Sequence, residues 1–125
     1  MNISEQIDGK PANLAQQAWF EELTEDQRLL LIAVESNDKR RFISLGGATT
    51  TNLNFTVSTD GVFLLMIAAA KGFVEMIELM SQNSTLDVSK TDANGVNAFF
   101  IAAWYNRLEA MRLLISMGCD ILAVN

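Results

Sequence analysis

Few side chains in this sequence could carry out chemistry, and their types argue against catalysis. The 125 residues include no histidine, which excludes a histidine-activated nucleophile and a histidine-ligated metal. The glycine patterns that cradle phosphate groups are also missing. The single cysteine, Cys119, cannot form a disulfide within the chain, and we interpret it as a small buried or half-buried residue. We therefore expect a protein that is not an enzyme and that binds no cofactor or metal.

The charge of the chain makes nucleic acid and membrane surfaces poor candidates for a partner. Fifteen acidic residues outnumber nine Lys and Arg, and the net charge of −6 repels phosphate groups. The basic run Lys39-Arg40-Arg41 follows Asp38 and predicts a solvated helix face. The longest apolar run, residues 62–70, is too short to cross a bilayer, and residues 1–17 contain no signal peptide. We expect a cytoplasmic protein.

An internal repeat with a period of 34 residues predicts the elements of the fold. When residues 61–83 are set over residues 95–117, seven of the 23 pairs are identical, where chance gives roughly one or two. The identical pairs are Gly61/Gly95, Val62/Val96, Ile67/Ile101, Ala68/Ala102, Ala69/Ala103, Glu75/Glu109 and Leu79/Leu113.

Each copy predicts two short helices joined by a turn. In the first of these copies, apolar residues 64–69 indicate one helix, and residues 74–80 indicate another at helical spacing. Gly72 breaks the chain between them, as Asn106 does in the next copy. A pair of such helices cannot bury its apolar faces alone, so the copies are expected to stack side by side.

The motifs in these copies resemble the ankyrin repeat. The similarity is carried by Asp92-Ala93-Asn94-Gly95, Ile101-Ala102-Ala103, Leu113-Leu114 and Gly118-Cys119-Asp120-Ile121. A fainter copy precedes them, with a helix at 30–34, a turn at Asn37-Asp38 and a second helix through Phe42 and Leu45. The resemblance covers residues 24–125. It implies an all-α, ankyrin-type solenoid of about three helix-turn-helix repeats, at about 24–57, 58–91 and 92–125.

The sequence departs from the family at its Thr-Pro-Leu-His motif. Residues 63–66 are Phe-Leu-Leu-Met in one copy, and residues 97–100 are Asn-Ala-Phe-Phe in the other. The resemblance implies hydrogen bonds from that Thr and His. We expect the packing of Met66, Phe99 and Phe100 to replace them, and the stability to be modest.

The segments outside the helical pairs lead to three further expectations. Residues 1–23 are expected to form an N-terminal helical cap that begins at Pro11 and covers the open end of the stack with Trp19 and Phe20. Residues 24–27, Thr-Glu-Asp-Gln, predict a capping box for the next helix. Residues 48–60 are either a variable loop or a strand-like finger through residues 53–57.

Trp104 and Tyr105 are the strongest candidates for a binding site. They follow Ala102-Ala103, where the resemblance implies an exposed concave face, and Lys71 is the residue that matches Tyr105. Tryptophan and tyrosine are enriched at energetic hot spots. The alternative is that Trp104 packs over the open end of the stack. The resemblance also implies a contribution from the turn tips, namely Thr59, Asp60, Val62, Asn94 and Val96.

These features predict a non-catalytic module that binds another protein through its concave face and turn tips. Two alternatives remain open. The apolar C-terminal residues Ile121, Leu122 and Val124 could drive self-association, since terminal repeats normally need a polar outer face. The chain could also be a regulatory fragment of a larger protein.

Overall fold

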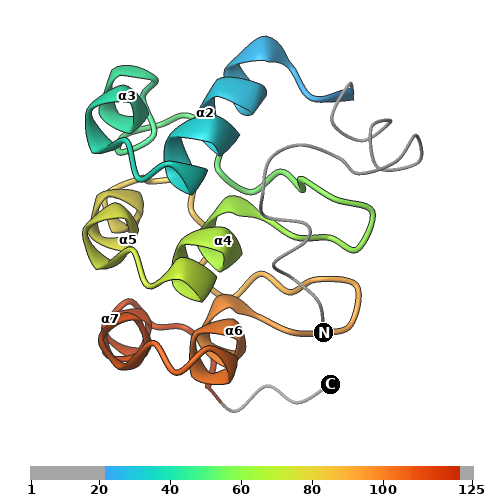
Figure 1. The fold of residues 1–125 in the computed structure, drawn as a ribbon, viewed down its shortest axis with the longest axis vertical. Coiled ribbons are helices and arrows are strands. Elements are labelled where there is room, and N and C mark those ends of the chain that lie inside the picture. The colour runs from blue at the N-terminus through green and yellow to red at the C-terminus, as the bar shows by residue number, and fades with distance from the viewer. Residues whose placement is uncertain (1–21, 122–125) are drawn as a thin grey trace.

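The computed structural model describes residues 22–121, and these form three helical hairpins stacked side by side (Figure 1). The hairpins pair α2 (Glu25–Glu35) with α3 (Lys39–Ser44), α4 (Leu64–Lys71) with α5 (Val74–Ser81), and α6 (Ala98–Trp104) with α7 (Leu108–Ser116). Within residues 22–121, β pairing is limited to two isolated bridges, Thr56–Phe63 and Thr91–Asn97. The predicted all-α solenoid is confirmed.

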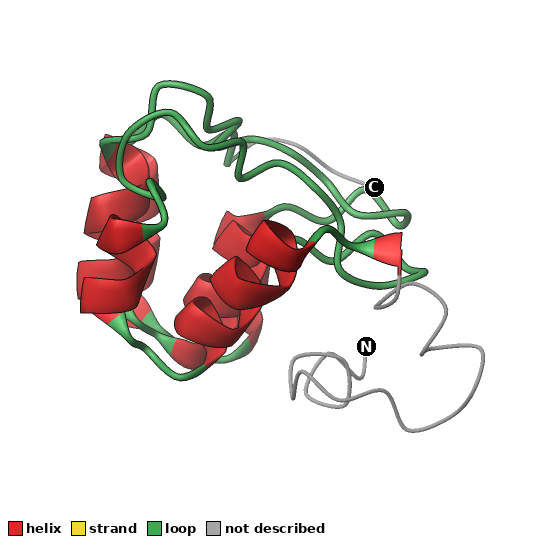
Figure 2. Ribbon diagram, turned by 90° about the horizontal axis from the view of Figure 1, so that it is seen from above, coloured by secondary structure: helices red, strands yellow, loops and turns green. Residues whose placement is uncertain are grey.

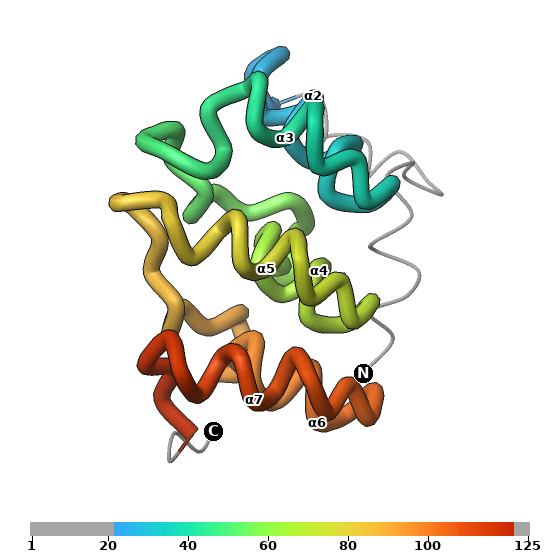
Figure 3. Tube along the Cα trace, turned by 90° about the vertical axis from the view of Figure 1, so that its left-hand side faces the viewer, coloured from blue at the N-terminus to red at the C-terminus, as the bar shows by residue number. Residues whose placement is uncertain are grey.

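The helices form two rows, which separate clearly when the stack is viewed from above (Figure 2). An inner row holds α2, α4 and α6, and an outer row holds α3, α5 and α7 (Figure 3). The helix α4 packs on both α2 and α6, and α5 packs on both α3 and α7. The long segments that join successive hairpins extend beyond the inner row as loops (Figure 1).

The chain reverses direction at the residues that the sequence indicated. Asn37, Gly72 and Asn106 lie in the turn between the two helices of each hairpin, with φ angles of 56°, 71° and 59°. Glycine and asparagine tolerate this left-handed conformation better than other residues. The predicted capping box is also present: Thr24 Oγ1 accepts from the Gln27 N–H at 3.1 Å, and Gln27 Oε1 accepts from the Thr24 N–H at 2.9 Å.

The hydrophobic core runs through the whole stack, from Leu23 to Cys119. Every residue from 64 to 70 is buried, because α4 has a neighbouring hairpin on each side. Met66 is fully buried, and the rings of Phe99 and Phe100 meet edge to face with centroids 5.8 Å apart. This arrangement places most of the apolar side chains in a single seam between the two rows.

The expectation that packing alone replaces the missing Thr and His bonds holds at α4 and is wrong at α6. The N-cap residue of α4, Phe63, makes no side-chain hydrogen bond to its helix. Asn97 caps α6, because its Oδ1 accepts from the Phe100 N–H at 3.1 Å. Its Nδ2 donates to the carbonyl oxygen of Asp120 at 2.7 Å, which also ties down the chain after α7.

Residues 48–60 form a loop that is fixed to the next repeat. The amide of the buried Asn83 donates to the carbonyl oxygens of Gly47 and Thr51, both at 2.8 Å. Within this loop, the side chains of Leu53 and Val57 are buried in the hydrophobic core. The strand-like finger is therefore reduced to the one bridge between Thr56 and Phe63. Residues 1–21 of the predicted cap, including Pro11, Trp19 and Phe20, lie outside the described residues. The C-terminal residues Leu122 and Val124 lie outside them as well.

Candidate functional site

The tip of the loop before α4 is a rigid turn with two exposed side chains. Ser58 is buried, and its Oγ accepts from the N–H groups of Asp60 at 3.2 Å and Val62 at 3.1 Å. Gly61 has a φ of 84° and completes the turn. Thr59 and Asp60 are left at the exposed edge, as the sequence predicted.

The tip before α6 repeats this construction with a different side chain. Asp92 takes the place of Ser58, and its Oδ1 accepts from the N–H groups of Asn94 at 2.8 Å and Val96 at 3.0 Å. Asn94 is exposed. The two tips are joined, because the Ala93 N–H donates to the carbonyl oxygen of Asp60 at 3.0 Å. Together they form one continuous edge.

Val62 and Val96 do not belong to the exposed surface, which corrects the prediction from sequence. Both side chains are buried and form part of the hydrophobic core. Each valine follows a glycine with positive φ that turns the chain back toward the helices, Gly61 or Gly95. The two valines therefore anchor the tips and leave partner contact to their neighbours.

The other predicted residues lie where the inner helices end. Trp104 is the last residue of α6, and its side chain is 66% exposed. Tyr105, the C-cap residue, is half-buried and packs against the core. Lys71 ends α4 and is half-buried, with its Nζ 6.0 Å from the centroid of the Phe73 ring.

The structure does not bring the two groups of predicted residues into contact. The tips precede the first residues of α4 and α6, whereas Lys71 and Trp104 are the last residues of those helices. The eight residues of α4 span about 12 Å. A partner that uses both groups must therefore extend along the inner helices from the tips to the helix ends.

Two residues that link neighbouring repeats were not identified by the sequence analysis. Arg107 Nε donates to the carbonyl oxygen of Ala70 at 2.9 Å, and Lys39 Nζ lies 4.0 Å from Glu75 Oε2. Both contacts connect one hairpin to the next. Arg107 directly follows the turn residue Asn106, and its residue type alone gave no signal of a contact with the preceding repeat.

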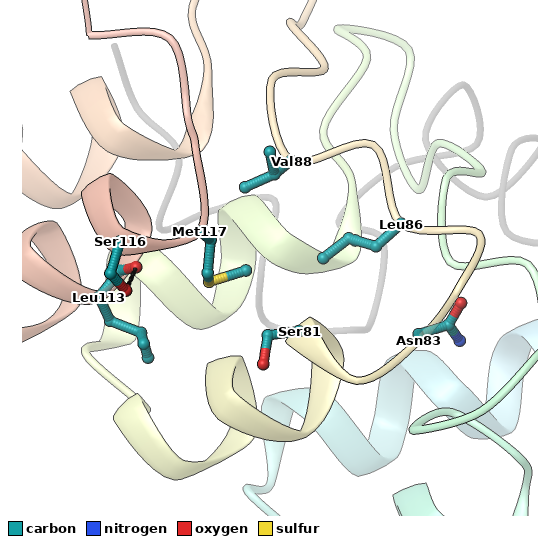
Figure 4. Close-up of a pocket in the computed structure, with 7 residues that line it drawn as sticks. All are labelled: Ser81, Asn83, Leu86, Val88, Leu113, Ser116 and Met117. Carbon is teal, nitrogen blue, oxygen red and sulfur yellow. Dashed lines mark hydrogen bonds between the residues drawn. The ribbon is translucent and has the colours of Figure 1, made fainter.

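An open hollow of about 390 Å³ lies between the C-terminal ends of α5 and α7 (Figure 4). It is lined by Ser81, Asn83, Leu86, Val88, Leu113, Ser116 and Met117. None of these side chains titrates near neutral pH. The hollow therefore offers no acid–base pair for catalysis.

Cys119 is a buried thiol, as the sequence predicted. Its Sγ donates to the carbonyl oxygen of Val88 at 3.4 Å, and burial raises the pKa of the thiol. A protonated thiol is a poor nucleophile.

Residues 22–121 contain no cluster of three His, Cys, Asp or Glu side chains that could hold a metal ion. No helix in this range is long and apolar enough to cross a membrane.

Comparison with known proteins identifies the repeated unit. A family model described as ankyrin repeats matches residues 25–125 in three copies. Protein phosphatase 1 regulatory subunit 12A from Rattus norvegicus and from Mus musculus are each 30% identical to this chain over 101 residues. The match covers 81% of this chain and 9% of each relative, so the chain spans less than a tenth of their length.

Proposed function

Because this chain belongs to the ankyrin-repeat family, we propose that it is a non-catalytic cytoplasmic module that binds another protein. Members of this family generally act in protein–protein interaction, and the curved stack of a solenoid leaves an inner surface open. We place the binding surface along the inner row, from the turn tips Thr59, Asp60 and Asn94 to the helix ends at Lys71, Trp104 and Tyr105.

The observation that carries this proposal is the exposure of Trp104. A tryptophan that is 66% exposed loses apolar contact with the rest of the protein, and burying it against a partner would recover this. Its counterpart in the preceding repeat, Ala70, is buried, so the variant Trp104→Ala must separate partner binding from the alternative in which Trp104 packs over the end of the stack. The rigid tips support the proposal, because pre-ordered loops lose little conformational entropy on binding.

A pull-down that compares the wild type with Trp104→Ala tests the proposal. A partner should be recovered by the wild type and lost with Trp104→Ala. Ile43→Ala is the matched control, since Ile43 is a large apolar residue, 53% exposed, on the outer helix α3. Equal recovery by all three proteins would contradict the assignment of Trp104.

A second proposal is that the repeats are the binding part of a larger regulatory protein. It is supported by the match of 101 residues to relatives that are named as regulatory subunits of protein phosphatase 1. The intact mass of the protein isolated from its own cells tests it. A mass well above the 13.8 kDa of this chain supports the proposal, and a mass equal to it is contrary evidence.

Self-association is a third proposal, and it is supported by exposed apolar residues in the last repeat. Leu108, Ile115 and Ile121 are exposed in addition to Trp104. Light scattering over a concentration series tests it, because a mass that stays at one chain at high concentration argues against assembly.

A further inference from the structure

The asparagine side chains in residues 22–121 differ in how firmly the structure holds them. Asn54, Asn83 and Asn97 use both the oxygen and the nitrogen of the carboxamide in hydrogen bonds. Asn52 Oδ1 accepts from the N–H of Asn54 at 2.9 Å, and Asn37 Oδ1 is buried. These five carboxamides are therefore bonded or shielded from solvent.

The two remaining asparagines of this range, Asn94 and Asn106, are exposed, and no hydrogen bond within residues 22–121 holds either side chain. They differ in the residue that follows. The N–H of Arg107, after Asn106, donates to the carbonyl oxygen of Ala102 at 2.8 Å, and a long side chain flanks its nitrogen. Gly95, after Asn94, has no side chain, so its amide nitrogen is open to close approach.

We propose that Asn94 is a site of spontaneous deamidation in the folded protein, with water as the only co-reactant. The amide nitrogen of Gly95 loses its proton and attacks Cγ of Asn94. A carbon–nitrogen bond forms and closes a succinimide ring, while the bond from Cγ to the side-chain nitrogen breaks and ammonia leaves. Water then opens the ring at either carbonyl to give aspartate or isoaspartate. Ammonia is thus exchanged for water, and position 94 gains one negative charge.

The hydrogen bonds of the tip before α6 control the rate of this reaction. The N–H of Gly95 donates to the carbonyl oxygen of Asp92 at 3.1 Å, and Asp92 Oδ1 holds the N–H groups of Asn94 and Val96. The Gly95 nitrogen must leave this bond before it can attack the side chain of Asn94. We therefore expect the folded chain to react several-fold more slowly than the unfolded chain, and a loosened tip to react faster.

The product adds charge to an edge that already carries a carboxylate. Asp60 is exposed on the neighbouring tip, at the position 34 residues before Asn94, and the Ala93 N–H joins the two tips through the Asp60 carbonyl oxygen. A carboxylate at position 94 gives both tips a negative charge, so the edge repels an acidic segment of a partner and attracts a basic one. This consequence rests on the proposed function, whereas the reaction itself does not.

Incubation of the full chain at mildly alkaline pH tests the proposal. Ion-exchange chromatography should show a species with one more negative charge, and mass spectrometry of its peptides should place the change at Asn94. Asn94→Ser removes the carboxamide from the tip and should abolish this species. Asn106→Ser is the matched control at the other exposed asparagine, and it should accumulate the species as the wild type does.

Two substitutions at Asp92 test the control by the tip. Asp92→Ala removes the acceptor for Asn94 and Val96 and should speed the reaction several-fold, while circular dichroism still shows folded repeats. Asp92→Ser also removes the carboxylate but supplies the hydroxyl that Ser58 uses in the neighbouring tip, so its rate should stay close to that of the wild type.

Urea measures the release of the tip without relying on the fold of any variant. The unfolded wild type should react several-fold faster than the folded one. In urea Gly95→Ala should slow the reaction, because the added methyl group hinders the attacking nitrogen.

Three results would overturn the proposal: a folded wild type that gains no charge while the chain in urea converts fully, an acidic species that forms unchanged in Asn94→Ser, or peptides that place the change at Asn106. Equal rates in the folded and unfolded wild type, or equal acceleration by Asp92→Ala and Asp92→Ser, would contradict the control by the tip.

Discussion

The Nε–H group of Arg107 donates a 2.9 Å hydrogen bond to the carbonyl oxygen of Ala70, so the third repeat completes the end of a helix in the second. Carbonyl groups in the last turn of a helix have no partner within it. The stem of Arg107 also lies over Gly72, where an added Cβ would come within 2.9 Å of the arginine Cδ. One side chain thus joins two repeats at the inner helix end.

Arg107→Ala should lower the free energy of unfolding by about 1 kcal/mol, because the bond to Ala70 is lost at a partly exposed site. Urea denaturation measures the change. Arg112→Ala removes the same charge from an exposed position on α7 and should change stability by less than about 0.5 kcal/mol. Equal losses of unfolding free energy in the two variants would show that removing the positive charge, and not breaking the hydrogen bond between repeats, lowers the stability.

Asn83→Ala should lower the free energy of unfolding by about 2 to 3 kcal/mol. The buried amide bonds to Gly47 and Thr51 in the first repeat, and its Oδ1 accepts from the Thr85 N–H at 2.8 Å, so several polar groups lose their partners. The control is Asn94→Ala at an exposed tip, which should be nearly neutral. A neutral Asn83→Ala would contradict the view that this amide fixes the loop at 48–60.

The stability of the protein should decrease as the pH rises through the titration range of Cys119. Burial raises the pKa of this thiol in the folded state, so the folded state favours the protonated form. The resulting stabilisation is complete below the ordinary thiol pKa of about 8.5 and is lost as pH rises toward the folded value. The stability of the wild type should therefore decline relative to Cys119→Ala above about pH 8.5, as followed by urea denaturation. Parallel pH profiles for the two proteins would contradict this.

The repeat architecture could be predicted because its signals are local. Gly72 and Asn106 marked the turns through residue type alone, and Thr24 and Gln27 marked the start of α2. Such features depend on backbone conformation over a few residues, which composition and spacing report directly.

The direction of side chains at the tips could not be predicted in the same way. The resemblance implied that Val62 and Val96 contribute to the exposed turn tips, yet each follows a left-handed glycine that returns it to the core. Asn97 looked like a lost family residue, and its capping bond to Phe100 depends on geometry that spacing alone does not reveal. Contacts between repeats, such as Arg107 with Ala70, require the stack itself.

The affinity for the partner recovered in the pull-down tests the central claim most directly. Calorimetric titration should show that Trp104→Ala weakens binding by roughly 2 kcal/mol or more, about thirtyfold in Kd, while the melting temperature stays nearly unchanged. Ile43→Ala should bind as the wild type does. A large drop in melting temperature with unchanged affinity would contradict the account and assign Trp104 to the packing of the stack.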